Sequence, residues 1–381
     1  MNFADFPMLG FNKNWVVVSI NMFIGGGGFS NERVLVLNYP ALRTGTGQGV
    51  YFTGLTDFCL HPATTYSATE NTEYLVSHLS SGGATYRLTT ITGTPAAPVL
   101  TPGTVKVRPG GGWTQAGGNS LPQAMGTCAT TPMKLESGDS FVRSNVVFRN
   151  SSIWYPQTIG LPAARTALTV DRTAAQWTQL DTGGNVIQGG RVEDPAATPT
   201  NGGKWYSYPS ISVNTSNDVL FGFSQFASNQ FASAGYTYRD HTDAAGTMRD
   251  PLIFKAGDDC YSKDFGSGRN RWGDYSHTMV DPTNDCNMWT IQEYAKFQAP
   301  PTVGGSTSKW GTWWAKVVPL STCVAPPPIL VAAGATVINE SCVPANSAAD
   351  PGERVTVNLK VMTMVVAAQQ ISWERCWHPP M

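Results

Sequence analysis

The sequence predicts an all-β protein, and three observations favour that fold class. Only 13% of the 381 residues are charged. Glycine (39) and proline (26), which make turns, are both frequent, and the chain holds 12 tryptophans. A low charge density combined with many turn formers and aromatic residues is typical of a chain built from many short strands.

Charge and hydropathy narrow the classes of partner. The formal net charge is −1, so no global field favours nucleic acid or an anionic membrane. No apolar run reaches the ~18 residues that a membrane span requires. We therefore expect a monomer that takes a small-molecule or carbohydrate substrate. The first residues, MNFADFPMLGFNKNWVVV, show neither the basic start nor the cleavage site of a signal peptide.

The cysteines favour an oxidising compartment. None has the CxxC or CxxH spacing of a zinc site, and six of the seven fall into local pairs, which indicates disulfides and a secreted or extracytoplasmic origin. Reduced core thiols are the alternative. The expected pairs are Cys59 with Cys128, Cys260 with Cys286, and Cys323 with Cys342, and Cys376 is left over.

An internal repeat organises most of the chain. Three segments each begin with a polar residue and an aromatic residue, pass through an Asn or Asp turn, and end in polar-x-aromatic. They are DFPMLGFNKNWVVVSINMF (5–23), SYPSISVNTSNDVLFGFSQF (207–226) and DYSHTMVDPTNDCNMWTIQEY (274–294), with turns at Asn12, Asn214 and Asp281. Alternating apolar residues on both sides of such a turn predict a β-hairpin.

The repeat predicts the architecture. Two weaker copies lie at 59–80 and 143–158, and a second hairpin-like stretch follows each copy, with turns at Gly183-Gly184 and at Gly246 in two cases. The unit is then about four strands and ~60 residues, the size of a propeller blade. We expect a β-propeller of five four-stranded blades over 1–321, or six if a poorly matching unit was missed. A tandem of β-sandwiches is the alternative.

The remainder of the chain is expected to be separate. Pro326-Pro327-Pro328 marks a Pro-rich linker over 322–335. The segment 336–381 resembles the opening of an immunoglobulin-like or convertase-P-type β-sandwich. A complete sandwich needs ~100 residues, so we expect an incomplete β segment followed by an atypical tail.

The repeat segments also carry a family resemblance. WYSYPSISVN, DVLFGFS, RWGDYSHTMVDP, MWTIQEYA and QWTQLDTGGNVIQGGRVEDP resemble secreted bacterial β-propellers that are loosely similar to the sialidase (neuraminidase) superfamily. That resemblance implies a hydrolase with its site on the propeller axis. The Asp-box of the superfamily has no clean match, and only Arg143 and Arg271 can be placed near inner strands as clamps for a substrate carboxylate.

Matched positions around the predicted channel provide the candidate site. The residues that open each repeat, and those that end the following strand, should converge on the axis. The predicted catalytic residues are Asp5, His61, Asp274, Tyr275 and Glu293. The predicted substrate-binding residues are Asn21, Arg143, Tyr208, Arg271 and Gln292. By contrast, Asp285 is expected to make a turn, and Trp272 and Trp289 are expected to pack between blades.

Two chemistries fit these residues. Paired carboxylates around a channel suit glycoside hydrolysis. Asp5, His61 and Asp274 would also suit a divalent cation, calcium or zinc, that activates water for hydrolysis of a phospho- or carboxylic ester. No organic cofactor is expected. The alternative function is a non-catalytic, secreted binding or surface-display module.

Overall fold

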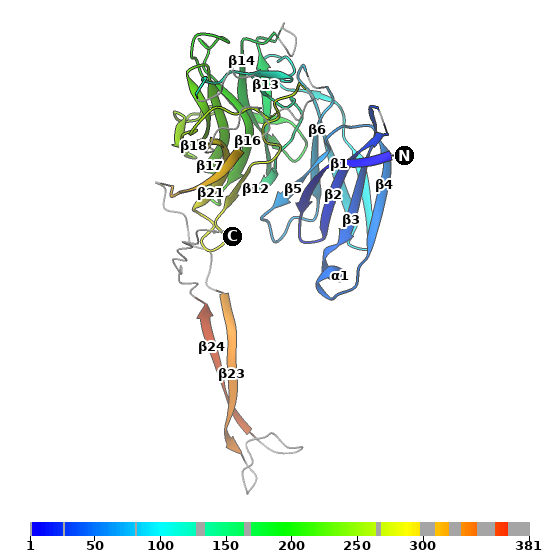
Figure 1. Ribbon diagram of the computed structural model, residues 1–381. Coiled ribbons are helices and arrows are strands. Elements are labelled where there is room, and N and C mark those ends of the chain that lie inside the picture. Colours follow the sequence, from blue (N-terminus) through cyan, green and yellow to red (C-terminus); the bar gives the residue numbers. More distant parts are fainter. Residues whose placement is uncertain are drawn as a thin grey trace, which may run out of the picture. The chain divides into compact units, whose positions relative to one another are not determined.

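The computed structural model describes residues 2–25, 27–80, 82–126, 134–163, 169–263, 268–297 and 309–319, together with the backbone of 329–340 and 355–364. The chain divides into two compact units. The first comprises residues 1–281 and 286–323, and the second comprises 282–285 and 324–381. Figure 1 labels the elements.

The described residues confirm an all-β protein. They form strands and one five-residue helix, α1 (Tyr39–Arg43). No helix among them is long and apolar enough to cross a bilayer.

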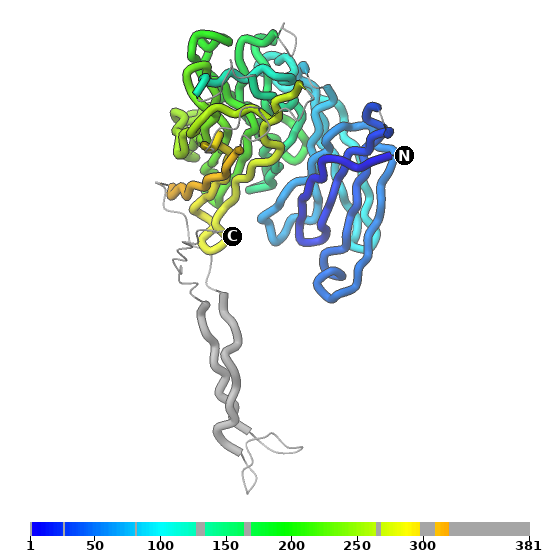
Figure 2. The backbone as a smooth tube through the Cα atoms, in the orientation of Figure 1, coloured from blue at the N-terminus to red at the C-terminus, as the bar shows by residue number. Residues whose placement is uncertain are grey.

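Most strands of the first unit belong to five antiparallel meanders that follow one another along the chain (Figure 2). Meander 1 is β1 (Asn2–Phe11), β2 (Trp15–Ile24), β3 (Phe29–Asn38) and β4 (Gly49–Leu55). Meander 2 is β5 (His61–Thr65), β6 (Glu73–His78), β7 (Thr85–Thr94) and β8 (Ala97–Pro102), and β9 (Lys106–Val107) also pairs with β7. Meander 3 is β12 (Val146–Arg149), β13 (Ser152–Leu161), β14 (Arg172–Asp181) and β15 (Val186–Val192). Meander 4 is β16 (Trp205–Val213), β17 (Val219–Ala227), β18 (Gln230–Arg239) and β19 (Leu252–Lys255). Meander 5 has three described strands, β20 (His277–Val280), β21 (Met288–Lys296) and β22 (Lys309–Val317). A separate short pair consists of β10 (Asn119–Leu121) and β11 (Leu135–Glu136).

The predicted hairpin turns are confirmed. Asn12 lies between β1 and β2, Asn214 lies between β16 and β17, and Asp281 follows β20. The side chain of Asn12 accepts hydrogen bonds from the backbone N–H groups of Asn14 and Trp15, as a turn asparagine does. Asp285 has a φ of 51°, a left-handed conformation that Asp tolerates better than most residues.

The first strands of the first three meanders lie side by side. β5 pairs in parallel with β1 and with β12, which joins these meanders into one sheet of 13 strands. Parallel neighbours need a long connection between them, and here the rest of each meander supplies it. β16 then packs against β12, β13 and β14, and β20 packs against β16.

Successive meanders share hydrophobic cores. Trp15 and Val34 of meander 1 pack with Leu75 and Ile91 of meander 2. The core between meanders 2 and 3 includes Tyr74 and Phe148, that between 3 and 4 includes Trp154 and Phe221, and that between 4 and 5 includes Leu220 and Met288. Each meander therefore buries apolar side chains against the next, which stabilises the sequential arrangement.

The second unit contains one described hairpin. β23 (Ile329–Glu340) pairs antiparallel with β24 (Val355–Met364). β23 begins inside the predicted linker 322–335, whereas the Pro326–Pro328 triplet and the tail beyond Met364 lie outside the described residues.

One predicted disulfide is wrong. Cys59 is a buried free thiol, and Asn21 holds it by accepting a hydrogen bond from its backbone N–H and donating one to its sulfur. Cys260 and Cys286 are both disulfide-bonded, and their pairing with each other stays a prediction. Cys128, Cys323, Cys342 and Cys376 lie outside the described residues.

Candidate functional site

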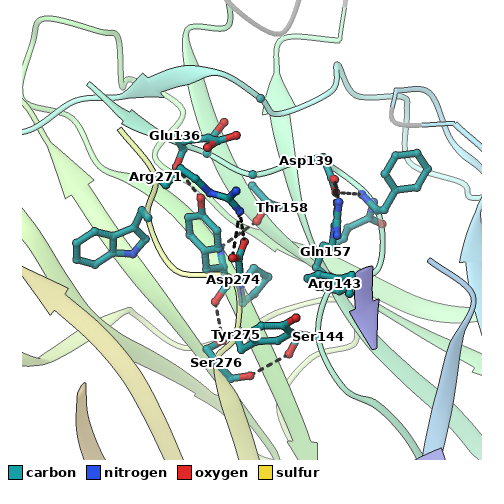
Figure 3. Close-up of a pocket in the computed structure, with 18 of the residues that line it drawn as sticks. Glu136, Asp139, Arg143, Ser144, Gln157, Thr158, Arg271, Asp274, Tyr275 and Ser276 are labelled. Atoms are coloured by element: carbon teal, nitrogen blue, oxygen red, sulfur yellow. Dashed lines mark hydrogen bonds and ion pairs between the residues drawn. The ribbon is translucent and has the colours of Figure 1, made fainter. Parts of the chain in front are cut away.

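A cavity of about 480 Å³ lies in the first unit. Its wall comes from β1, β13 and β16 and from the two segments that precede β12 and β20 (Figure 3). Four of the five repeat starts that the sequence predicted to converge contribute to it, with Asp5, Arg143, Tyr208 and Asp274, and the second start, at His61, does not. The cavity therefore collects side chains from parts of the chain that are more than 250 residues apart.

Two aromatic residues of the wall have an unusual backbone. Phe6 and Tyr208 have φ values of 56° and 55°, and the antiparallel register shifts between Asp5 and Met8 and between Ser207 and Ser210. An aromatic residue in the left-handed region before a proline is disfavoured. The repeated aromatic-Pro pair therefore marks a β-bulge, which turns the aromatic residue out of the ladder at the cavity.

Hydrogen bonds hold the Tyr208 bulge in place. Its backbone N–H donates to Thr158 Oγ1 at 3.0 Å, and its hydroxyl donates to the backbone carbonyl of Glu136 at 2.6 Å. The hydroxyl of Ser276 donates to the Tyr208 carbonyl at 2.9 Å. Burial is the main cause that raises the Tyr208 pKa well above its usual value, so this phenol stays protonated at neutral pH.

Aromatic and cationic groups form one side of the cavity. The rings of Phe6 and Tyr275 are stacked, with centroids 5.1 Å apart and an interplanar angle of 17°. The guanidinium carbon of Arg143 lies 4.1 Å from the Phe6 ring centroid and 5.3 Å from that of Phe58. Tyr275 is 57% exposed, so its ring is accessible to a ligand.

Three arginine–carboxylate pairs border the cavity. Arg143 Nε lies 3.0 Å from both carboxylate oxygens of Asp139. Arg271 donates to Asp274 at 3.1 and 3.2 Å. The third pair, Arg269 with Glu136, joins the segment before β20 to β11. Figure 3 shows the Asp139–Arg143 pair and the Arg271–Asp274 pair at separate places on the wall.

Electrostatics single out two carboxylates. Partial burial raises the pKa of Asp274, and the charge of Arg271 opposes that rise. Burial, reinforced by the charge of Asp274, raises the pKa of Glu293 to about 7. A Cβ at Gly273 would meet Glu293 Oε2 at 2.8 Å. Glu293 therefore lies directly behind the backbone that carries Asp274.

The structure divides the predicted site residues into two groups. The residues that line the cavity are Asp5, Arg143, Tyr208, Arg271, Asp274 and Tyr275. The residues that do not line it are Asn21, His61, Gln292 and Glu293.

The four residues that do not line the cavity are buried. Asn21 accepts a hydrogen bond from the backbone N–H of Cys59. Gln292 donates to Ser210 and Thr290 at 2.9 Å. His61 Nδ1 lies 3.4 Å from the carbonyl of Val142, and burial lowers the His61 pKa to about 4. None of the four lines the cavity, and their predicted roles stay predictions.

The predicted metal set is not assembled. Within the described part of the chain, one group of three or more His, Cys, Asp or Glu side chains brings its ligand atoms within 4.8 Å of one another. That group is Asp218, Asp240 and His241, not Asp5, His61 and Asp274. His61 is the physical reason, because its ring is buried against Val142 rather than turned to the cavity.

The two tryptophans that were predicted to pack between blades lie in different environments. Trp272 is buried among Phe226 and Tyr261, as predicted, although it also contributes to the cavity wall. Trp289 is half-buried, and its ring lies 5.2 Å from that of Trp314. Its indole N–H donates to Asp281 at 3.0 Å.

Sequence reasoning missed several wall residues, above all Arg269 and Glu136. Arg269 lies two positions before Arg271, and in an extended segment such residues share a face. That spacing is the signal that could have identified it. Glu136 offered no signal, because it meets Arg269 across 133 positions of sequence. Gln157 and Thr158 lie in the middle of β13 and reach the cavity only through tertiary packing.

No known family profile matches the sequence, and no curated protein does. Among solved structures, a protein of unknown function from Dyadobacter fermentans DSM 18053 aligns with a TM-score of 0.40 and 10% identity, over 81% of this chain and 82% of that one. A glycoside hydrolase aligns with a TM-score of 0.35 and 8% identity, over 94% of this chain and 73% of that one. A structure described for the GH130 family of mannoside phosphorylases, which contains glycoside hydrolases that target β-1,2-mannosidic linkages in Candida mannan, aligns with a TM-score of 0.25 and 10% identity, over 86% of this chain and 87% of that one. These similarities are distant and assign neither a family nor an activity to this chain.

Proposed function

We propose that the five meanders form a β-propeller and that the cavity is the mouth of its central channel. Three features support this arrangement. Each meander shares a core with the next. The first strands of meanders 1, 2 and 3 are parallel neighbours. Phe6 of meander 1 stacks on Tyr275, which immediately precedes meander 5, so the first and last repeats meet.

On this arrangement we propose a hydrolase that acts on glycosides bearing an acidic group. The observation that carries the proposal is that Asp5 and Asp274 border the same stacked aromatic pair in one cavity. The negative charges of both act on the Tyr275 hydroxyl, so both carboxylates lie near that ring. Glycoside hydrolysis needs two carboxyl groups on either side of the scissile bond.

The roles follow from the environments. Partial burial favours the protonated form of Asp274, which suits the acid that protonates the leaving oxygen. Asp5 is the proposed second carboxylate, acting as nucleophile or base. Tyr275 offers its face to a sugar ring. The guanidinium groups of Arg143, Arg269 and Arg271 favour a substrate carboxylate.

The test is a screen of the purified protein against chromogenic glycosides of neutral and acidic sugars, with and without EDTA, followed by Asp274→Asn. We expect hydrolysis of an acidic glycoside, and we expect the variant to lose at least ~100-fold in kcat, the usual contribution of a general acid. Asp285→Asn is the matched control, because Asp285 does not line the cavity and Asn tolerates its left-handed φ. An Asp274→Asn protein as active as the parent would refute the assignment.

A metal-assisted esterase has less support. Among the described residues, the cavity carboxylates belong to no group with metal-ligand spacing. EDTA should therefore leave kcat unchanged on any substrate that the cavity hydrolyses.

The second candidate function is a non-catalytic module that binds carbohydrate. One observation favours it, which is that Asp139, Asp274 and Glu136 are each paired with an arginine, and a paired carboxylate is a weaker base. Glycan-array binding without turnover of any bound glycan would support this function over the hydrolase.

We propose that the protein works as a monomer outside the cytoplasm. The disulfide-bonded state of Cys260 and Cys286 supports an oxidising compartment. Size-exclusion chromatography with light scattering tests the monomer, and mass spectrometry of the non-reduced protein tests the disulfide-bonded state.

A further inference from the structure

A second group of chemically capable side chains lies away from the cavity. Asp218 immediately precedes β17, and Asp240 and His241 immediately follow β18. The antiparallel register pairs Val219 with Arg239, so the neighbours of these two residues meet at one end of the sheet. The ligand atoms of Asp218, Asp240 and His241 all lie within 4.8 Å of one another.

This group lies at the far end of β16 from the cavity. Tyr208 of the cavity wall and Asn214 of the turn before β17 are six residues apart, which corresponds to about 20 Å of extended strand. Asn214 donates to the second carboxylate oxygen of Asp218 at 3.0 Å. The group is thus distinct from the proposed catalytic site.

The geometry matches that of a small divalent ion. His241 Nδ1 lies 2.9 Å from Asp218 Oδ1 and 3.5 Å from Asp240 Oδ1. Two ligands bound tetrahedrally to zinc at 2.0–2.1 Å are roughly 3.3 Å apart, and the two observed separations bracket that value. An ion at this place would take the position of the Nδ1 proton between His241 and the two carboxylates.

The ligand set is held before any ion arrives. Asp218 is fully buried, and its Oδ1 accepts the backbone N–H of His241 at 2.9 Å. Asp240 Oδ1 accepts from the backbone N–H and the hydroxyl of Thr242 at 3.0 and 2.7 Å. These contacts fix both carboxylates, as supporting hydrogen bonds do around metal ligands.

A buried hydroxyl points independently to a ligand here. Tyr238 is 9% exposed, and its hydroxyl has no partner within hydrogen-bond geometry. Tyr238 precedes Asp240 by two positions at the end of β18, and residues two apart in an extended chain share a face. An ion, or water bound to it, would give this group the partner that buried polar atoms normally have.

We propose that Asp218, Asp240 and His241 bind a divalent cation of the zinc class, which ties the β16–β17 turn to the end of β18. One imidazole nitrogen with two carboxylate oxygens suits zinc and similar borderline ions. Calcium and magnesium take oxygen ligands almost exclusively. The ion has a structural role, and the proposal does not depend on the proposed hydrolase.

The test uses the full chain, without an affinity tag and stripped with EDTA. Isothermal titration calorimetry should show one Zn²⁺ bound per chain. Thermal unfolding should show a higher Tm with Zn²⁺, and no comparable rise with Ca²⁺ or Mg²⁺. His241→Ala and Asp240→Asn should each weaken Zn²⁺ binding at least ~10-fold, the lower end for altered metal sites. His277→Ala, which removes an exposed histidine outside the group, should bind zinc as the parent does.

Two further measurements keep the outcome decisive. Circular dichroism of each metal-free variant checks that the variant is folded. If His241→Ala does not fold, the test rests on Asp240→Asn. Co²⁺ should bind with a visible spectrum that lacks a thiolate charge-transfer band, which excludes a cysteine site. If the parent fails to bind zinc, or if both variants bind it as tightly as the parent does, the group is an Asp–His ion pair only and the proposal is wrong.

Discussion

At the scale of single residues, the strained aromatic positions explain why the cavity lies where it does. A bulky residue in the left-handed region costs about 1–3 kcal/mol, and Phe6 and Tyr208 both adopt it. Tyr208 offsets the strain with its hydrogen bonds to Thr158 and Glu136. Phe6 does so with the Tyr275 stack and the Arg143 contact. Such strain is typical of preorganised binding surfaces, which agrees with the proposed role of the cavity.

Glu32 provides a residue-scale prediction about pH. Glu32 is fully buried in β3, and burial raises its pKa to about 8. The folded protein therefore keeps a proton that the unfolded chain releases above pH ~4.5. Stability should fall as pH rises from about 5 to 8, by up to ~4 kcal/mol from this group. Glu32→Gln should be more stable than the parent at pH 8 and should show a shallower decline.

Urea unfolding at pH 5 and pH 8 measures both effects. Glu293 and Glu73, whose pKa values burial also raises, act in the same direction, so Glu32→Gln reduces the decline without removing it. Asp250→Asn, at an exposed position, is the control and should follow the parent at both pH values. Parallel curves for Glu32→Gln and the parent would show that Glu32 is charged in the folded state.

The sequence could place Asp274 and Tyr275 at the cavity, but it could not show that Glu293 lies outside the cavity wall. Register with Asp5 and Phe6 identifies the first pair, because the repeated polar-aromatic start is a local pattern. The direction of Glu293 depends on Gly273, whose missing Cβ leaves room for the carboxylate. That contact is tertiary, so no alternation within β21 reveals it.

At the scale of elements, strand order was easier to predict than strand boundaries. β5 begins at His61, as expected, whereas β12 and β20 each begin three residues after the predicted starts at Arg143 and Asp274. In both cases the preceding segment carries cavity side chains and forms a local ion pair, Arg143 with Asp139 or Asp274 with Arg271, instead of a ladder. The alternation of polar and apolar residues indicates an extended chain. It therefore cannot separate an extended segment without ladder hydrogen bonds from the strand that follows it.

Close approach of β1 and β5 gives an element-scale prediction. A Cβ at Gly10 would lie 2.5 Å from the backbone oxygen of Ala63 and 2.6 Å from the backbone carbon of Pro62. Because backbone atoms cannot turn aside, Gly10→Ala must push the two strands apart. We expect a loss of about 2 kcal/mol, as for other overpacking substitutions, measured by urea unfolding.

Gly47→Ala is the matched control for this prediction. A Cβ at Gly47 meets nothing within 4 Å, so the substitution should leave stability within ~0.5 kcal/mol of the parent. If Gly10→Ala is equally harmless, β1 and β5 do not pack as closely as described, and the parallel pairing of the first strands loses its support.

At the scale of the whole molecule, local repeats could predict five units, but not the contacts that link them around the cavity. The Glu136–Arg269 pair and the Phe6–Tyr275 stack join residues 133 and 269 positions apart. A single sequence holds no record of such partners. The pairing of Glu136 with Arg269 was missed for that reason.

The division into two units supports a last prediction, about truncation. All strands from β1 to β22 and every residue of the cavity wall belong to the first unit. A chain of residues 1–321 should therefore unfold in urea with the same midpoint as the first transition of the full chain. It should also keep the full activity or glycan binding of the cavity, because no wall residue is removed.

A chain that ends at residue 297 is the control, because it lacks β22. That strand pairs with β21 along its whole length, from Met288 opposite Val317 to Lys296 opposite Lys309. Its removal leaves β21 with one neighbouring strand and exposes the backbone groups that β22 satisfies. We expect this shorter chain to unfold at lower urea or to aggregate. If the 1–321 chain behaves as the 1–297 chain does, the second unit contributes to the fold of the first, and the two are not independent.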